Sequence, residues 1–165
     1  MQTASGLAIR KRIRLREFVY GGHFAYYITI CAFQKRLLFG SCDGVQVTLT
    51  ELGRLVQNSW LETQALRPEA VLDELIVMPN HMHAIVRLTS EEPGHDPASV
   101  SPMQKPLFRV VGGFKSHVTS VWRAMKNDET LQVWQVRFND RVIRTEHELL
   151  HEREYIRANP ERWRR

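Results

Sequence analysis

Two histidines one residue apart open an apolar run in "VMPNHMHAIVRL", residues 77–88. If this run is a β-strand, alternate side chains share a face, so His81 and His83 lie on one face and Met82, Ala84 and Val86 on the other. The second set is apolar and predicts the core face. The two imidazoles then point away from that core, within reach of one metal ion. His-x-His is a short pattern, and two histidines without any ligand role are the alternative.

A third ligand is expected from the segment "HEREYIRANP", residues 151–160. On a helix His151, Tyr155 and Asn159 are spaced i, i+4 and i+8 and form one stripe. Asn159 offers an amide oxygen and Tyr155 a phenolic oxygen. Imidazole ligands suit zinc, whereas oxygen ligands with a substrate phosphate suit magnesium or manganese. We favour Mg²⁺ or Mn²⁺, because the substrate would supply further oxygens.

Tyr155 has two interpretations. It is either an amphipathic helix residue with its hydroxyl at the surface, or a nucleophile. A phenol with an ordinary pKa near 10 needs help at neutral pH. A metal that polarises a phosphate makes the phosphorus a better target for attack. A phosphotyrosine would also conserve the energy of the phosphodiester, so that a strand can be rejoined without ATP.

The elements that must position these residues follow from hydrophobic periodicity and turn signals. A capping box of Thr48 and Glu51 opens the first helix, and "PN" joins two strands as a hairpin. The first predicted elements are a strand at His23–Phe33, a helix from Thr48 to before Pro68, and strands on either side of Pro79. A long flexible loop at about 89–105 follows, and then a helix in Gln104–Lys126 that is best formed after Gly113. The last elements are a β region in 131–145 and a final helix that stops before Pro160. This order predicts an α+β, ferredoxin-like βαββαβ fold with a central antiparallel sheet, its helices on one face, and a C-terminal helix that carries the tyrosine.

Length and charge suggest one domain, residues 1–165, with a polyanionic partner. The chain has 165 residues, a formal net charge of +5 and a pI near 9.6. Positive charge attracts phosphates, although basic tails are often merely solvated. The clustered cations are Arg10, Lys11, Arg12, Arg14 and Arg16 in a basic N-terminal arm of about residues 1–20, and Arg157, Arg162, Arg164 and Arg165 at the other end.

The two cysteines, Cys31 and Cys42, have no spacing suited to a disulfide framework or a zinc knuckle. That usage suits a reducing cytoplasm. No apolar run approaches the roughly 20 residues that span a bilayer, and the N-terminus lacks the apolar stretch of a signal peptide. We therefore expect a cytoplasmic protein without a membrane partner.

The motifs "MPNHMHAIV" and, far downstream, "YIRANP" resemble the HUH-type single-tyrosine transposases of bacterial insertion sequences, and specifically the REP-associated tyrosine transposases. The resemblance extends to "RKRIRLREFVYGGHFAYYITICAFQKRLLFG", "GGFKSHVTSVW", "WQVRFNDRVIR" and "NPERW", and so covers nearly the whole chain.

This resemblance implies a metal-dependent single-stranded DNA endonuclease and strand transferase, associated with the bacterial nucleoid. His81 and His83 match the family's histidine pair, Tyr155 its nucleophile and Asn159 its polar third ligand. Attack on DNA would leave a 5′-phosphotyrosine and a free 3′-hydroxyl, next to a palindromic REP-like hairpin. The basic arms would grip the hairpin backbone. Lys115, in "FKS", is either a phosphate contact or a solvated helix residue.

Two other functions remain open from the sequence. One is a protein of the same fold that binds hairpins without cutting them. The other is a metal phosphoesterase that uses a bound water in place of Tyr155. Among relatives of the resembled family both dimers and monomers occur, and the short link "FNDRVIRTEHE" before the tyrosine helix favours a monomer over a homodimer.

Overall fold

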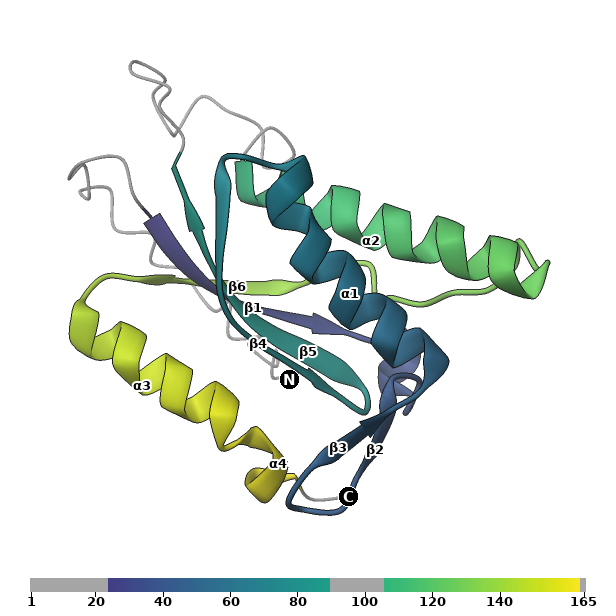
Figure 1. Ribbon diagram of the computed structural model, residues 1–165, viewed down its shortest axis with the longest axis horizontal. Coiled ribbons are helices and arrows are strands. Elements are labelled where there is room, and N and C mark those ends of the chain that lie inside the picture. Colours follow the sequence, from purple (N-terminus) through teal and green to yellow (C-terminus); the bar gives the residue numbers. More distant parts are fainter. Residues whose placement is uncertain (1–23, 90–105, 164–165) are drawn as a thin grey trace, which may run out of the picture.

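A four-stranded antiparallel sheet forms the centre of the fold (Figure 1). The computed structural model describes residues 24–89 and 106–163. The sheet order is β4-β5-β1-β6, and every neighbouring pair is antiparallel. Its strands are β1 (Phe24–Cys31), β4 (Ala70–Met78), β5 (His81–Leu88) and β6 (Asn139–Ile143). The predicted α+β class is confirmed, and so is the hairpin that turns at Pro79 and Asn80.

Helices cover both faces of this sheet. Two long helices lie on one side of it and the two C-terminal helices lie on the other (Figure 1). The long helices are α1 (Glu51–Leu66) and α2 (Pro106–Lys126), and the C-terminal ones are α3 (Glu146–Arg157) and α4 (Asn159–Arg162). The helix that carries the tyrosine therefore covers the face of the sheet that was predicted to carry the histidines.

The two sides have separate hydrophobic cores. Under α1 and α2 the larger core contains Met82, Ala84 and Val86 of β5, as their alternation predicted. On the other face Ile85 packs with residues of β6 and α3 in a small cluster. Ile85 is fully buried. Its burial seals the α3 side of the sheet next to the histidines, so that side is only partly open to a ligand.

A second, two-stranded sheet is formed by the part of the sequence between β1 and α1. It consists of β2 (Gly40–Cys42) and β3 (Val47–Leu49), and it follows the short 3-10 turn η1 (Phe33–Lys35). The thiol of Cys42 donates a hydrogen bond to the carbonyl oxygen of Pro160 over 3.6 Å. This small hairpin therefore contacts α4, directly after the tyrosine helix.

Several predicted boundaries differ from the structure. The β2–β3 hairpin, which begins in "GSCDGV" (residues 40–45), was not among the predicted elements. Because β3 takes up Thr48, the predicted capping box of Thr48 and Glu51 is wrong. The cap is Thr50, whose hydroxyl accepts the backbone N–H of Gly53 over 3.1 Å.

Helix α2 is well formed earlier than predicted, and a further short helix follows α3. Helix α2 runs unbroken through Gly112 and Gly113, because the buried apolar stripe that includes Val111 and Phe114 offsets a cost of about 1 kcal/mol for each glycine. Helix α3 stops before Pro160 as predicted, yet Pro160 enters the first turn of α4, where a missing N–H costs nothing.

The other two predicted β segments are shorter than expected. The β region in 131–145 contains only β6 and an isolated bridge between Ala32 and Trp134. The first strand ends at Cys31, because η1 begins at Phe33. Its predicted first residue, His23, the basic arm and the loop at 90–105 lie outside the described residues.

Candidate functional site

The register between β1 and β5 gathers a polar group around the histidine pair. Cys31 lies opposite His81, and Thr29 lies opposite His83. Directly opposed residues of an antiparallel pair point to the same face. His83 is 7% exposed, and both histidines line a hollow that is also lined by Trp163, directly after α4.

Each imidazole is held by its Nδ1 atom, and the two Nε2 atoms converge. Nδ1 of His81 donates to the side-chain oxygen of Asn80 over 2.6 Å, because an amide oxygen can only accept. Nδ1 of His83 lies 2.9 Å from the hydroxyl oxygen of Thr29. The two Nε2 atoms are 3.0 Å apart. Thr29 and Asn80 therefore set the ring orientations in the way that outer partners of metal ligands usually do.

The spacing of the Nε2 atoms fits a shared metal ion. Two ligands at right angles around an octahedral ion, each about 2.1 Å from it, are about 3.0 Å apart. Within residues 24–89 and 106–163, no group of three or more His, Cys, Asp or Glu side chains is arranged to hold a metal. A metal at His81 and His83 would therefore need an amide oxygen, water or the substrate as its remaining ligands.

Both histidines are poised to stay neutral. Burial, followed by the nearby charge of Lys35, lowers the pKa of His81 from 6.5 to about 4. Burial, followed by the proximity of His81, lowers the pKa of His83 to about 3, and a hydrogen bond to the backbone of Ile28 offsets part of that shift. Neutral imidazoles are the form that binds metal.

Tyr155, on α3, lies beside His83. Its ring centroid is 5.9 Å from that of His83, with the planes at 68°. The guanidinium of Arg162, one helix later, lies 5.0 Å from the Tyr155 ring centroid, within cation–π distance. Arg162 was predicted to contact the hairpin backbone; the structure places it beside Tyr155, and its contact with DNA stays a prediction.

A second tyrosine, Tyr27 of β1, touches both groups. Its ring centroid lies 5.2 Å from that of His83 and 6.3 Å from that of Tyr155. Burial, reinforced by the neighbouring Tyr155, raises the pKa of Tyr27 above its ordinary value. Its burial therefore holds Tyr27 in the neutral form.

Asn159 is brought to the same end of the sheet but is not continuous with the Tyr155 helix. Helix α3 ends at Arg157 and Asn159 begins α4, so the predicted stripe of three is broken at Ala158. The Asn159 side chain is 7% exposed, and its nitrogen donates to the backbone oxygen of Tyr155 over 3.4 Å. His151, the first member of that stripe, is exposed and lies 3.5 Å from Glu152.

Ion pairs fasten α3 to the sheet. Arg153 donates two hydrogen bonds, of 2.8 and 2.7 Å, to the carboxylate of Asp73 on β4, and Arg157 pairs with Glu74. The pairing of β4 with β5 is irregular between Leu72 and Leu75, where these two acids lie. A bulge re-aims side chains, and here both carboxylates meet the helix. On the far side Arg141 of β6 pairs with the buried Glu152.

A cavity of about 280 Å³ opens beside the pair. Lys35 and Trp163 line it together with both histidines. The ring centroid of Trp163 is 6.1 Å from that of His81. Tryptophan and lysine are residues that can contact a base and a phosphate, so the cavity extends the site beyond the histidines.

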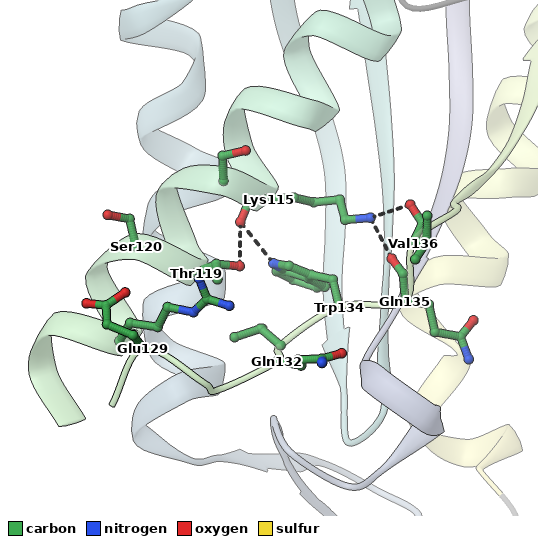
Figure 2. Close-up of a pocket in the computed structure, with 11 residues that line it drawn as sticks. Lys115, Thr119, Ser120, Glu129, Gln132, Trp134, Gln135 and Val136 are labelled. Atoms are coloured by element: carbon green, nitrogen blue, oxygen red, sulfur yellow. Dashed lines mark hydrogen bonds between the residues drawn. The ribbon is translucent and has the colours of Figure 1, made fainter. Parts of the chain in front are cut away.

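Lys115 does not line this cavity, although it interacts electrostatically with Cys31, which does. Its ammonium donates to the backbone oxygens of Gln135 and Val136 over 2.6 and 3.0 Å, beside an open hollow of about 500 Å³ (Figure 2). Burial lowers the pKa of Lys115. The structure assigns Lys115 a role in holding the segment after α2, and its contact with DNA stays a prediction.

Other predicted DNA contacts cannot be located. Arg10, Lys11, Arg12, Arg14, Arg16, Arg164 and Arg165 lie outside the described residues. Conversely, the sequence interpretation missed the roles of Thr29, Tyr27 and Lys35. The period-2 spacing of Tyr27 and Thr29 was a signal, but only the strand register shows which face they share with the histidines.

Known proteins give this arrangement a context. The chain is 34% identical over 168 residues to an uncharacterized protein of Haemophilus influenzae, and the match covers 96% of this chain and 92% of that protein. A solved structure of a REP-associated tyrosine transposase bound to a REP hairpin matches with a TM-score of 0.57 and 21% identity, over 88% of this chain and 70% of that one. A transposase candidate from Deinococcus radiodurans R1 aligns at 13% identity with a TM-score of 0.49, over 85% and 93% of the two chains. No family model matches the sequence.

Proposed function

Since the chain belongs to one family with the Haemophilus influenzae protein and has the fold of the REP-associated tyrosine transposase, we propose that it is a metal-dependent single-stranded DNA endonuclease and strand transferase. The observation that carries the proposal is the approach of Tyr155 to His83 beside two converging Nε2 atoms. Fold alone does not define activity. A phenol next to two neutral imidazoles that can bind a metal ion, however, suits phosphoryl transfer. The strand order β4-β5-β1-β6 supports assignment of the topology as ferredoxin-like.

His81 and His83 would hold a divalent ion, Mg²⁺ or Mn²⁺, with the amide oxygen of Asn159 as a third ligand. When bound, such an ion polarises a phosphate and stabilises charge on its oxygens. Asn80 and Thr29 keep the imidazole rings oriented for this task. The low pKa values of the histidines keep their lone pairs available at neutral pH.

Tyr155 would be the nucleophile. Its phenolic oxygen forms a bond to phosphorus, the bond from phosphorus to the 3′-oxygen breaks, and the 3′-oxygen takes up a proton while the phenol releases one. The products are a 5′-phosphotyrosine and a 3′-hydroxyl. Reversal of the same step, with a different 3′-hydroxyl, rejoins or transfers strands. Tyr27 is less suited to attack, because burial raises its pKa.

The proposed substrate is a hairpin of REP type with a single-stranded flank. The transposase of similar fold is bound to a REP hairpin, and this chain carries a net charge of +5. Arg162 is the cation next to Tyr155 and would contact the phosphate under attack. The N-terminal arginines remain the proposed contacts to the hairpin backbone.

A covalent-adduct assay tests the proposal. The protein is incubated with hairpin oligonucleotides that carry a randomised single-stranded flank, with Mn²⁺ or Mg²⁺ or with a chelator, and is then run on a denaturing gel. We expect a protein–DNA adduct that needs metal and disappears in Tyr155→Phe. Tyr27→Phe is the matched control and should keep the adduct.

The alternative functions give different results in the same assay. A protein that only binds hairpins would shift the DNA on a native gel and give no adduct with either metal. A phosphoesterase that activates water would still cut DNA as Tyr155→Phe, but not as His81→Ala. Either pattern would overturn the proposal.

A further inference from the structure

We propose that Lys35 and Trp163 form a subsite for the nucleotide upstream of the cleaved bond. Lys35 stabilises the 3′-oxygen of this nucleotide as the bond between that oxygen and phosphorus breaks. This inference rests on the proposed function and assigns one strand of the substrate to one side of the site. Both residues border His81, but neither has a role in the proposed function stated above. The subsite is the 280 Å³ cavity beside the histidines.

The order of the rings separates the nucleophile from this cavity. Tyr155 neighbours His83, His83 neighbours His81 at 4.5 Å between centroids, and His81 neighbours Trp163. The cavity is lined by Trp163, Lys35 and both histidines, but not by Tyr155. The two imidazoles therefore stand between the attacking phenol and the cavity.

The geometry of phosphoryl transfer indicates which nucleotide the cavity would hold. The attacking and leaving oxygens lie roughly in line through phosphorus. With phosphorus above the histidine pair and Tyr155 on the His83 side, the leaving oxygen points toward the His81 side. A 5′-phosphotyrosine requires that this oxygen be the 3′-oxygen of the upstream nucleotide. The cavity is thus placed to take that nucleotide.

The chemistry of the lining fits a nucleotide. An indole can stack on any base without reading its identity, and Trp163 is partly exposed at the cavity. Lys35 supplies a cation where negative charge develops on the departing oxygen. The same charge contributes to the lowered pKa of His81, which places Lys35 near this histidine. A group aimed at developing charge contributes to the rate more than to ground-state binding.

The backbone around Lys35 is strained in a way that orients it. Gln34 and Lys35 both have positive φ, 52° and 55°, a conformation that is unfavourable for residues other than glycine. Hydrogen bonds hold this turn: the N–H of Lys35 donates to Ala32, and the N–H of Ala32 donates to Asn80, each over 2.9 Å. The turn that carries Lys35 is thereby tied to the residue that orients His81.

The test uses leaving-group chemistry. A cleavable flank is first selected from the randomised hairpin pool with the wild-type protein, and is then synthesised with either oxygen or sulfur at the bridging 3′ position. Sulfur is a better leaving group and needs no cation. We expect Lys35→Gln to slow adduct formation on the oxygen substrate by about tenfold or more, and the sulfur substrate to restore most of the rate. Arg36→Gln, at the adjacent exposed cation outside the cavity, is the matched control and should react as the wild type.

The outcomes separate this inference from the proposed function. A wild-type adduct with equal rates for Lys35→Gln and Arg36→Gln, or with a Lys35→Gln defect that sulfur does not relieve, would overturn the subsite and leave the tyrosine chemistry intact. No wild-type adduct from the whole pool would overturn both. Trp163→Phe should preserve the rate, because it keeps an aromatic ring. Trp163→Ala should raise the KM for the flank. Equal KM values for these two variants would show that Trp163 is not part of the subsite.

Discussion

At the scale of single residues, the histidine pair shows what alternation along a strand can and cannot reveal. Met82, Ala84 and Val86 defined the core face from sequence, and the structure confirms that face. The partners of the rings could not be predicted, because Thr29 is 54 residues from His83 in the chain. Strand register depends on hydrogen bonds across the sheet, and the pattern of one strand does not contain it.

Thr29 offers a direct test of how His83 is prepared for metal. A hydroxyl can both donate and accept, so it suits either tautomer of His83 and lets Nε2 give up its proton when metal arrives. We expect Thr29→Val, which keeps the shape, to weaken Mn²⁺ binding by about 10- to 100-fold, as measured by calorimetry. Thr29→Ser keeps the hydroxyl and should bind almost as the wild type; equal affinities for Val and Ser would refute the role.

The same histidines predict a pH dependence of stability in the metal-free protein. Their pKa values are lowered on folding, from 6.5 to about 4 and about 3, so the unfolded chain binds protons more readily. The stability is then fully present above pH 6.5 and falls as the pH drops toward 4, by up to about 1.4 kcal/mol per pH unit for each group.

Urea unfolding between pH 7.5 and 4.5 measures this loss. His83→Gln should show a shallower dependence than the wild type over this range. The pKa of Asp73 is also lowered from 3.8, chiefly by its hydrogen bond with Arg153, so its contribution is lost mainly below the range measured. An unchanged slope in His83→Gln would contradict the assignment.

At the scale of elements, helices with strong periodicity were predicted well and short connections were not. The sequence indicated α1, the β4–β5 hairpin and α3, because each has a continuous apolar pattern and a recognisable end. The β2–β3 hairpin has strands of only three residues, too short for a pattern. Its position depends on contacts with α1 and α4, which no local signal reports.

Gly53 carries one of those contacts. A Cβ atom at Gly53 would lie 1.9 Å from the backbone oxygen of Phe39, whereas nothing lies within 4 Å of a Cβ at Gly112. We expect Gly53→Ala to lower the free energy of unfolding by about 1–3 kcal/mol. Gly112→Ala, inside the exposed part of α2, should raise it by about 0.5–1 kcal/mol. Chemical denaturation of both variants compares the two, and a neutral Gly53→Ala would show that the segment leading into β2 is not packed tightly on α1.

At the scale of the whole molecule, the tyrosine helix lies on the sheet of its own chain. Ion pairs on both sides, from Arg153 to Asp73 and from Arg141 to Glu152, hold α3 over the histidines. Among the described residues, no helix is long and apolar enough to cross a membrane. The position of α3 follows from charges on a β-bulge, which the sequence order of elements did not indicate.

This arrangement predicts that each chain contains a complete site. We expect light scattering to give a monomer, and a mixture of His83→Ala and Tyr155→Phe proteins to form no adduct. If two chains exchanged their tyrosine helices, an equimolar mixture would recover about a quarter of the wild-type activity, because half of the dimers would be mixed and each would hold one intact site of two. Such a recovery would contradict a monomeric site.

The central claim is that Tyr155 bonds to DNA at the histidine pair, and peptide mapping of the adduct tests it most directly. The adduct made with Mn²⁺ is digested with protease and nuclease, and mass spectrometry locates the nucleotide. We predict a 5′-phosphate linked to Tyr155 and a free 3′-hydroxyl on the released strand. A nucleotide on Tyr27 or on any other residue, or cleavage that leaves no protein-linked nucleotide, would contradict the account.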